Sequence, residues 1–252
     1  MRLTKVLSDG NIYNTSEKKG LFYPLEGDFY NYTGISSVPL ERIDKVLCPV
    51  KPSKVVALGL NYHLHIKEFD SSSIPKEPVI FIKPDTSVIG PGENIILPKR
   101  SSRVDYEAEL AFVISKDCKD ISEEEADEYI LGYTCLNDVT ARDLQKIDGQ
   151  WTRAKGYDTF CPIGPSVVTG IEPDNLEIKA ILNGEVKQQG NTSDMIFTVK
   201  QTLSYISGIM SLKKGDVICT GTPSGIGPMS DGDTIEIYIE GIGSLINPVK
   251  AS

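Results

Sequence analysis

Short apolar runs separated by turn residues dominate the pattern of hydrophobic and polar positions along the chain. The segments 54–60 (KVVALGL) and 78–84 (PVIFIKP) predict buried strands, because they are short and rich in β-branched residues. The segment 104–115 (VDYEAELAFVIS) is the longest strand candidate, and 133–138 (YTCLND) predicts the next strand. The C-terminal segments GDVICTGTPSGIG and GDTIEIYIEGIGSLINPV return to strands with glycine-rich turns. The pattern therefore predicts a mainly β fold of the α+β class with few short helices.

Two dipeptides predict tight hairpin turns. Asp9-Gly10 lies between RLTKVL and NIYNTS, and Asn183-Gly184 lies between the alternating halves of LEIKAILNGEVKQQ. Both pairs tolerate the positive φ that such turns require. The stretch after the first hairpin predicts irregular structure and is closed by Pro49 and Pro52. We therefore place a domain boundary near residue 50, with a small β domain at 1–50 and a larger domain at 51–252.

Helical signals are confined to a few segments. The segment 121–133 (ISEEEADEYILGY) predicts a helix with Ser122 as N-cap and Glu125 completing a capping box. A short helix is expected at TARDLQ, and helical spacing recurs in FTVKQTLSYISGIM. The polar segment 63–78 is broken by serines and prolines, so it is either a surface loop or a short mobile helix.

The composition is that of an ordinary globular protein. Hydrophobic residues make up 40% and charged residues 24% of the chain, which allows a sizeable core. No run approaches the roughly 18 apolar residues of a membrane span, and the N-terminus lacks the apolar core of a signal peptide. We therefore expect a cytoplasmic protein. The five cysteines form no CxxC pair, and we expect reduced, mostly buried thiols.

The charge balance narrows the class of partner. With 35 acidic against 26 basic residues the net charge is -9, which argues against nucleic acid. A small molecule or a protein is the more plausible partner. An anionic substrate would need a local cation, either a metal or a cluster of lysine and arginine side chains.

Three carboxylates form a candidate metal site. Side chains alternate along a strand, so Glu107 and Glu109 project from one face about 7 Å apart. Their like charges repel unless a cation lies between them, and Asp138 at the end of the next strand offers a third oxygen. An all-carboxylate set favours magnesium or manganese over zinc. The alternative is an ordinary solvated strand face, and Asp105, which shares it, is either solvated or a neighbour of the ligands.

Five segments together resemble one family. In order and spacing, the region from about residue 53 to 247 is similar to the fumarylacetoacetate hydrolase family, through VDYEAELAFVI, GYTCLNDVTARDLQ, QWTRAK, NGEVKQQGNTSDMIF and GDVICTGTPSGIG. The resemblance implies a mixed β-sandwich or β-roll, a homodimer, and a small N-terminal β extension before residue 50. It also implies that Glu107, Glu109 and Asp138 bind a divalent metal.

The resemblance implies enolate chemistry on a small 2-oxo acid. A divalent metal chelated by the substrate acts as a Lewis acid on the charge that develops as a C–C bond breaks. Our leading hypothesis is a hydrolase that cleaves an acylpyruvate-type 2,4-dioxo acid through a pyruvate enolate, with Mg²⁺ or Mn²⁺. The alternatives are an oxaloacetate decarboxylase and an isomerase of the 2-hydroxyhepta-2,4-diene-1,7-dioate type. A metal-dependent ligand-binding protein that lost catalysis is the non-enzymatic alternative.

Two histidines precede the first carboxylates, in NYHLHIKEF. If this segment is helical, His65 and Glu68 face each other, and the carboxylate could orient an imidazole that activates water. The family's hydrolytic members use a His-Glu pair here, whereas His63 is expected on the surface. The resemblance places Lys155 at the site, where it could bind an enolate or polarise a carbonyl. Arg142 could pair with a substrate carboxylate, or equally brace a metal-binding carboxylate.

Further polar positions are weaker candidates for substrate contacts. They are Gln145, Gln150 and Thr222, the last in a glycine-rich turn whose N–H groups could hold an anion. The segment from His63 to Pro75 is expected to form a lid. Compared with some relatives, Leu60 replaces an arginine and Asp105-Tyr106 replaces a more basic dipeptide. These departures put recognition of a second, distal carboxylate in doubt.

Overall fold

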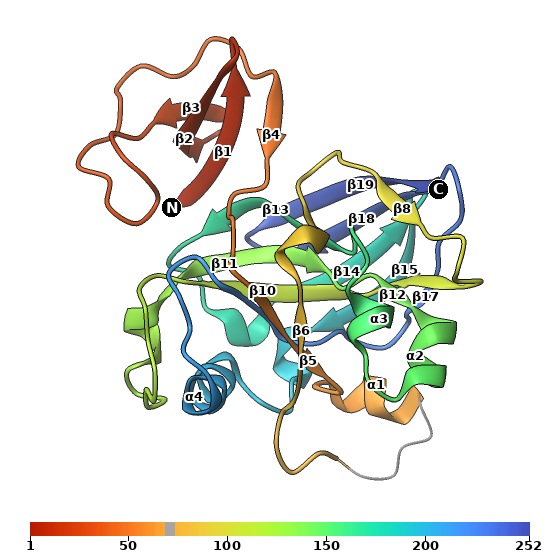
Figure 1. Cartoon of the computed structure of the whole chain (residues 1–252). Coiled ribbons are helices and arrows are strands. Elements are labelled where there is room, and N and C mark those ends of the chain that lie inside the picture. The colour runs from red at the N-terminus through yellow and green to blue at the C-terminus, as the bar shows by residue number, and fades with distance from the viewer. Residues whose placement is uncertain (69–73) are drawn as a thin grey trace.

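The computed structural model of the chain describes residues 1–68 and 74–252, with the side chains of Lys67 and Glu68 outside that description. Most of the regular structure is strand, and the helices are few and short (Figure 1). This confirms the expected mainly β fold. Within the described part of the chain, no helix is long and apolar enough to cross a membrane.

The main sheet contains 11 strands. Its continuous path runs β3 (Leu21–Pro24), β2 (Asn11–Lys18), β1 (Arg2–Ser8), β13 (Cys161–Val168), β11 (Ile130–Asn137), β10 (Ala108–Ile114), β16 (Val217–Cys219), β5 (Val55–Gly59) and β6 (Val79–Lys83). Two short strands, β4 (Lys45–Leu47) and β7 (Val88–Ile89), pair with β1 and β13. Because β7 closely follows the edge strand β6 and pairs with β13, this part of the sheet curls back on itself.

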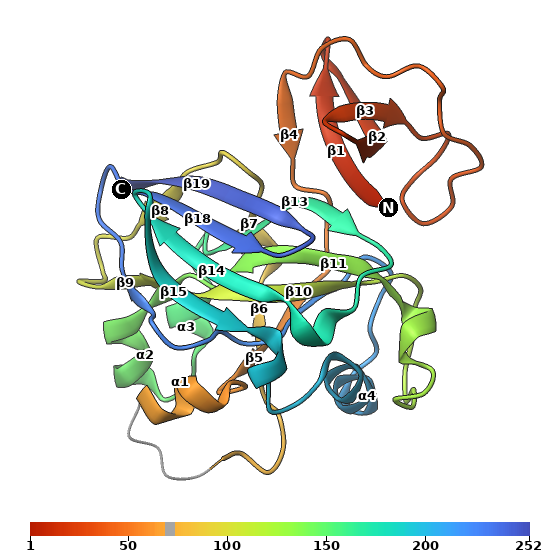
Figure 2. The same ribbon diagram turned by 180° about the vertical axis from the view of Figure 1, so that it is seen from behind.

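A five-stranded sheet covers one face of the main sheet (Figure 2). Its order is β15 (Glu185–Asn191), β14 (Glu177–Leu182), β18 (Thr234–Ile239), β19 (Gly243–Ala251) and β8 (Ile95–Leu97). A small third sheet joins β12 (Thr140–Ala141), β9 (Val104–Tyr106) and β17 (Gly227–Pro228).

The α-helices are α1 (His63–Glu68), α2 (Arg142–Asp148), α3 (Thr152–Lys155) and α4 (Val199–Ile209). Short 3₁₀ turns are η1 (Asp85–Ser87), η2 (Ala126–Tyr129), η3 (Pro173–Asn175) and η4 (Thr192–Asp194).

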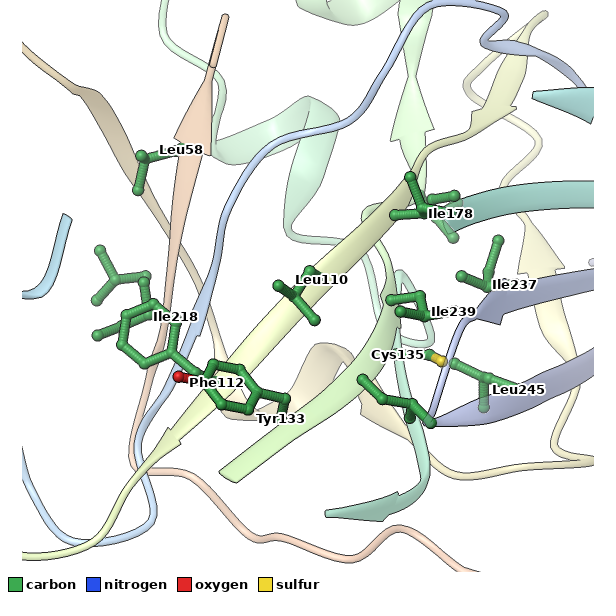
Figure 3. Close-up of a cluster of buried hydrophobic side chains, with 14 of the residues drawn as sticks. Leu58, Leu110, Phe112, Tyr133, Cys135, Ile178, Ile218, Ile237, Ile239 and Leu245 are labelled. Atoms are coloured by element: carbon green, nitrogen blue, oxygen red, sulfur yellow. The ribbon is translucent and has the colours of Figure 1, made fainter. Parts of the chain in front are cut away.

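The core lies between the two larger sheets. Leu110 and Cys135 of the main sheet face Ile178, Ile237 and Leu245 of the second sheet (Figure 3). Every residue of β10 is buried, so both faces of this strand are covered. A carboxylate on β10 is therefore held inside the protein and not on a solvated face.

Both predicted hairpins are present. Asp9 and Gly10 join β1 to β2 with φ of 47° and 77°, and Asn183 and Gly184 join β14 to β15 with φ of 52° and 83°. The helix expected at 197–210 is α4, which begins with a complete capping box. All five cysteines are free thiols, and four of them are buried.

The prediction of a helix at 121–133 was wrong. Only the single 3₁₀ turn η2 forms, and residues from Ile130 onward join β11, where Ile130 pairs with Ile114. The Ser122 N–H does donate to Glu125 Oε2 at 2.9 Å, so the local capping contact forms without a following helix. Strand pairing with β10 overrides the helical spacing of this segment.

The single strand expected at 104–115 is interrupted at Glu107. The N–H of Glu107 donates to Asn137 Oδ1 at 3.0 Å, and its carbonyl oxygen accepts from the Asp138 N–H at 2.9 Å. These contacts separate β9, which belongs to the small sheet, from β10, which follows it along the chain and belongs to the main sheet. The interruption brings Glu107 beside the end of β11.

The N-terminal segment is more regular than expected, because β3 and β4 form where the sequence indicated irregular structure. β1 pairs with β13 through Arg2 opposite Val168 and Leu3 opposite Val167. A buried hydrogen bond of 2.7 Å joins Thr4 Oγ1 and Ser166 Oγ across this junction. The strands before residue 50 therefore extend the main sheet.

Replacing Asp216 should destabilise the fold. Its buried carboxylate accepts from the Ser53 hydroxyl at 2.7 Å and the Lys213 N–H at 2.8 Å, and it pairs with Lys54. We expect Asp216→Asn to lower the free energy of unfolding by about 1.5–3 kcal/mol, since hydrogen bonds to charged groups are worth that much. Urea denaturation at neutral pH measures the loss, with exposed Asp158→Asn as the control.

The pH dependence of this stabilisation has a definite sign. Burial would raise the pKa of Asp216, but the bonds from Lys54, Lys213 and Ser53 lower it below its ordinary value. The stabilisation is present at neutral pH and is lost as the pH falls through the folded-state pKa. The difference between wild type and Asp216→Asn should therefore shrink in acid, and a constant difference would contradict this assignment.

Candidate active site

The three predicted carboxylates lie together inside the protein. Glu107 is at the interruption before β10, Glu109 is on β10, and Asp138 directly follows β11. One ligand oxygen from each lies within 4.8 Å of the others, and all three residues are buried. The pairing of Ala108 with Asn137 sets this arrangement, since it aligns the end of β11 with the start of β10.

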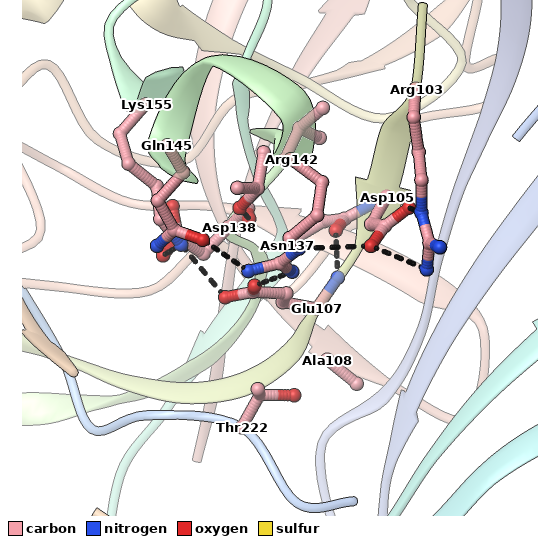
Figure 4. A network of polar contacts seen from close by, with 12 residues as sticks. Arg103, Asp105, Glu107, Ala108, Asn137, Asp138, Arg142, Gln145, Lys155 and Thr222 are labelled. Carbon is pink, nitrogen blue, oxygen red and sulfur yellow. Dashed lines mark hydrogen bonds and ion pairs between the residues drawn. The ribbon is translucent and has the colours of Figure 1, made fainter. Parts of the chain in front are cut away.

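Two lysines contact the carboxylates. Lys155, at the end of α3, donates from Nζ to Glu107 Oε2 at 2.8 Å and to Asp138 Oδ2 at 2.5 Å (Figure 4). Lys83, at the end of β6, is fully buried and contacts the other Asp138 oxygen, Oδ1. Asp138 is thus held between two ammonium groups.

Arg142 braces the carboxylates from the first turn of α2. It donates to Asp105 Oδ2 at 2.9 Å, contacts Glu107 Oε1, and donates to Gln145 Oε1 at 2.6 Å. Asp105 is fully buried and also pairs with Arg103. The bracing role considered for Arg142 is therefore present, and its guanidinium orients Gln145 as well (Figure 4).

Glu109 differs from the other two carboxylates in its surroundings. Its Oε2 accepts from the Gly221 N–H at 2.8 Å, but among the residues that the structure describes no lysine or arginine forms an ion pair with it. Burial raises its pKa, and the charges of Asp138 and Glu107 raise it further. This local excess of negative charge fits a divalent cation with oxygen ligands.

The other charges at the site are compensated. Burial would raise the pKa of Glu107, but the positive charges of Lys155 and Arg142 lower it below its usual range. Burial would lower the pKa of Lys155, but Asp138 and Glu107 raise it above its ordinary value. Lys155 is therefore an ammonium at neutral pH, next to a carboxylate set that remains ionised at Glu107.

These groups open into one cavity of about 300 Å³. It is lined by Leu58, Gly59, Leu60, His65, Glu107, Glu109, Arg142, Gln145, Lys146, Trp151, Lys155 and Thr222. The lining is charged and polar around the carboxylates and apolar at Leu58, Leu60 and Trp151. The cavity can hold a small organic anion beside the carboxylate oxygens of Glu107 and Glu109.

The structure describes the predicted base, His65, but not the side chain of its predicted partner, Glu68. His65 is on α1, is only 5% exposed, and lines the cavity. The Glu68 side chain lies outside the described residues, as do residues 69–73 of the expected lid, so both remain predictions. His63 is exposed, and its ring Nδ1 is 2.9 Å from the Asp194 carbonyl oxygen.

Of the remaining substrate-binding candidates, some line the cavity and one does not. Thr222 lines the cavity and its Oγ1 accepts from Gln188 Nε2 at 2.9 Å. Gln188 in turn accepts from the Ala108 N–H at 3.0 Å, which ties the glycine-rich turn to β10. Gln145 lines the cavity, whereas Gln150 is exposed and is absent from its lining. The Gly221 N–H bonds to Glu109 and is not available for an anion.

Several functional positions were not found from the sequence. Lys83 ends the apolar run VIFIK and is the one buried residue of β6, whose other side chains are half-buried or exposed, so the prediction of a buried strand at 78–84 was wrong. Trp151 packs where Gly59 has no side chain, since a β-carbon there would collide with the indole ring. The Trp151 ring also makes an edge contact with Phe81, at 5.2 Å between centroids. The indole thereby connects β5, β6 and the helix that carries Lys155.

The comparisons with known proteins agree with this geometry. The model of the fumarylacetoacetate hydrolase C-terminal domain matches residues 54–250. The chain belongs to the fumarylacetoacetate hydrolase family. It is 50% identical over 245 residues to a protein of Archaeoglobus fulgidus, covering 97% of this chain and 94% of that one. The family membership and the charged cavity together indicate an enzyme.

Two of the relatives are named for an activity. Oxaloacetate tautomerase fahd2 of Xenopus laevis is 41% identical over 217 residues, covering 81% of this chain and 68% of that one. A solved structure of 5-carboxymethyl-2-hydroxymuconate delta-isomerase from Mycobacterium smegmatis has a TM-score of 0.91 and 44% identity, and all of both chains are covered. The family fold is thus shared over the whole length of this chain.

Replacing Glu109 should separate metal binding from folding. We expect Glu109→Gln to raise the melting temperature of the metal-free protein, because it removes a buried charge repelled by its neighbours. The same change should abolish the stabilisation that Mg²⁺ or Mn²⁺ gives the wild type. Thermal unfolding with and without metal measures both effects, and exposed Glu123→Gln is the matched control. Unchanged stabilisation by metal in Glu109→Gln would contradict the metal site.

Replacing Lys83 should destabilise the protein through Asp138. We expect Lys83→Met to cost about 3 kcal/mol, the usual scale for breaking a buried ion pair. Lys187, which is exposed and pairs with Glu185, provides the control Lys187→Met, with an expected change within about 0.5 kcal/mol. Chemical denaturation compares the two variants, and equal small losses would show that Lys83 has no such role.

Proposed function

We propose that this protein interconverts the keto and enol forms of a short 2-oxo dicarboxylic acid, with a divalent metal held by Glu107, Glu109 and Asp138. The observation that carries the proposal is the buried carboxylate triad, of which Glu107 and Glu109 line a cavity together with Lys155 and His65. The tautomerase and isomerase names of two relatives support the same class, since both reactions move a proton beside a carbonyl.

The metal and Lys155 would share the task of stabilising negative charge. Bound Mg²⁺ or Mn²⁺ supplies Lewis-acid stabilisation of charge on the 2-oxo oxygen of the substrate. Lys155 adds a fixed ammonium whose pKa is raised, so it remains charged while the oxygen gains charge. Glu107 and Asp138 hold its Nζ in place before substrate binds.

His65 is the candidate for proton transfer. Its imidazole lines the cavity, and imidazole is the side-chain group that most often serves as general acid or base. It can accept the proton from C3 of the substrate, while the C–H electron pair forms the C2–C3 double bond. Protonation of the 2-oxo oxygen then gives the enol, and the reverse sequence returns the keto form.

Hydrolysis of an acylpyruvate is the second candidate. The presence of His65 in the cavity favours it, because an imidazole that accepts a proton from carbon can also accept one from water. Attack of that water on the distal carbonyl would release pyruvate as its enolate. Decarboxylation of oxaloacetate needs no activated water and therefore depends on Lys155 more than on His65.

The His65→Ala variant tests these assignments. With Mg²⁺, wild-type protein should interconvert oxaloacetate tautomers, and His65→Ala should lose about 10²-fold or more of kcat, the scale of general acid–base catalysis. Ultraviolet absorbance of the enol follows the reaction, and pyruvate release from acetylpyruvate and oxaloacetate measures hydrolysis and decarboxylation. His63→Ala removes an exposed imidazole outside the cavity lining and is the matched control.

The outcomes distinguish the candidates. Faster turnover of acetylpyruvate than of oxaloacetate would favour the hydrolase, and pyruvate formed from oxaloacetate would favour the decarboxylase. Tautomerisation that persists after EDTA treatment would contradict a metal-dependent mechanism.

A further inference from the structure

The face of α2 toward the cavity carries three polar side chains. Arg142, Gln145 and Lys146 follow the i, i+3, i+4 spacing, so they lie on one side of the helix, and all three line the cavity. Arg142 is buried, Gln145 is half-buried, and Lys146 is exposed. The helix therefore presents polar groups from the carboxylates out to the rim of the cavity.

The charges of the site are equal in number before any ligand binds. The four buried carboxylates Asp105, Glu107, Glu109 and Asp138 are accompanied by the three buried cations Lys83, Arg142 and Lys155 and by the half-exposed Arg103. A divalent metal would leave two positive charges for the carboxylate and the developing oxyanion of a 2-oxo acid. The charge of a second carboxylate on the substrate would need a further cation.

Lys146 is a cation of the cavity lining that is not among these four cations. It is the lysine of the cavity lining for which no described residue forms an ion pair or hydrogen bond with Nζ. The apolar part of the lining consists of Leu58, Leu60 and Trp151, against which a carboxylate would lose its hydration without gaining a partner. A distal carboxylate is therefore better placed beside Lys146 than beside these three side chains.

We infer that Lys146 determines substrate specificity by binding the distal carboxylate of a 2-oxo dicarboxylate. The inference rests on the proposed function, because that function places the 2-oxo acid end of the substrate at Glu107, Glu109 and Asp138. Lys146 then acts on binding and not on proton transfer. Leu60 and Trp151 offer a charged group no partner in the apolar part of the lining.

A matched pair of substrates tests the inference. Oxaloacetate and 2-oxobutyrate differ only in a distal carboxylate against a methyl group, and exchange of C3 hydrogen for deuterium by NMR measures enolisation of both. We expect Lys146→Ala to lower the ratio of kcat/KM for oxaloacetate over 2-oxobutyrate about three- to fivefold, the scale of an exposed ion pair. The change should appear in KM for oxaloacetate, and higher ionic strength should lower the wild-type ratio.

Two charge variants and a control sharpen the result. Lys146→Arg should retain most of the ratio, and Lys146→Glu should lower it further than Lys146→Ala through repulsion. Lys18→Ala removes an exposed lysine of β2 that is absent from the cavity lining, and it should leave the ratio unchanged.

The failures of the two proposals are distinguishable. Wild-type turnover of both substrates with equal ratios in wild type, Lys146→Ala and Lys146→Glu would overturn the role of Lys146 alone. If the wild type turns over neither, the proposed function fails, and calorimetric affinities of Mg²⁺-loaded protein for the two acids decide on Lys146. Equal preference in wild type and Lys146→Glu would then overturn it.

Discussion

The burial of three carboxylates within reach of one another is the constraint on which the site depends. Charges removed from water are costly unless they are paired, and three like charges repel as well. At Glu107 and Asp138 this cost is offset by ion pairs with Lys155, Arg142 and Lys83. Glu109 receives a backbone N–H from Gly221 and no ammonium from the described residues. The remaining negative charge makes this a place for a cation.

The curvature of the main sheet makes this compensation possible. In the order of strands, β6 is separated from β10 by β16 and β5, yet Lys83 at its end contacts Asp138 beyond β11. The contact forms because the chain after β6 turns back to pair with β13 through β7. A flat sheet would place these two groups far apart. The roll of the sheet thus brings an edge strand to the three clustered carboxylates.

Local signals in the sequence predicted much of the fold. Asp9-Gly10 and Asn183-Gly184 determine their own backbone conformation, so both hairpins could be placed from the dipeptides alone. The helix expected at 121–133 failed because its spacing competes with the partner strand β10, and partner strands are not visible in a local pattern. The interruption at Glu107 was missed for the same reason, since it depends on Asn137 and Asp138.

The residues of the site were also predicted only in part from the sequence. The resemblance to a family indicated Glu107, Glu109 and Asp138, and the structure brings their oxygens together. Lys83 and Lys146 were not recognised, because the first reaches the site through the curvature of the sheet and the second through the face of a helix. Neither relation can be obtained from spacing along the chain.

The contact between Gly59 and Trp151 has a consequence for how this catalytic scaffold can diverge. The indole ring occupies the space that any side chain at position 59 would need, and the same residue precedes the short helix that ends in Lys155. Enlarging that glycine would displace the ammonium from the carboxylates as well as reshape the cavity wall. A substitution at position 59 would therefore affect the cavity wall and Lys155 together, whereas exchanges at Leu60 or Lys146, which also line the cavity, do not involve this contact.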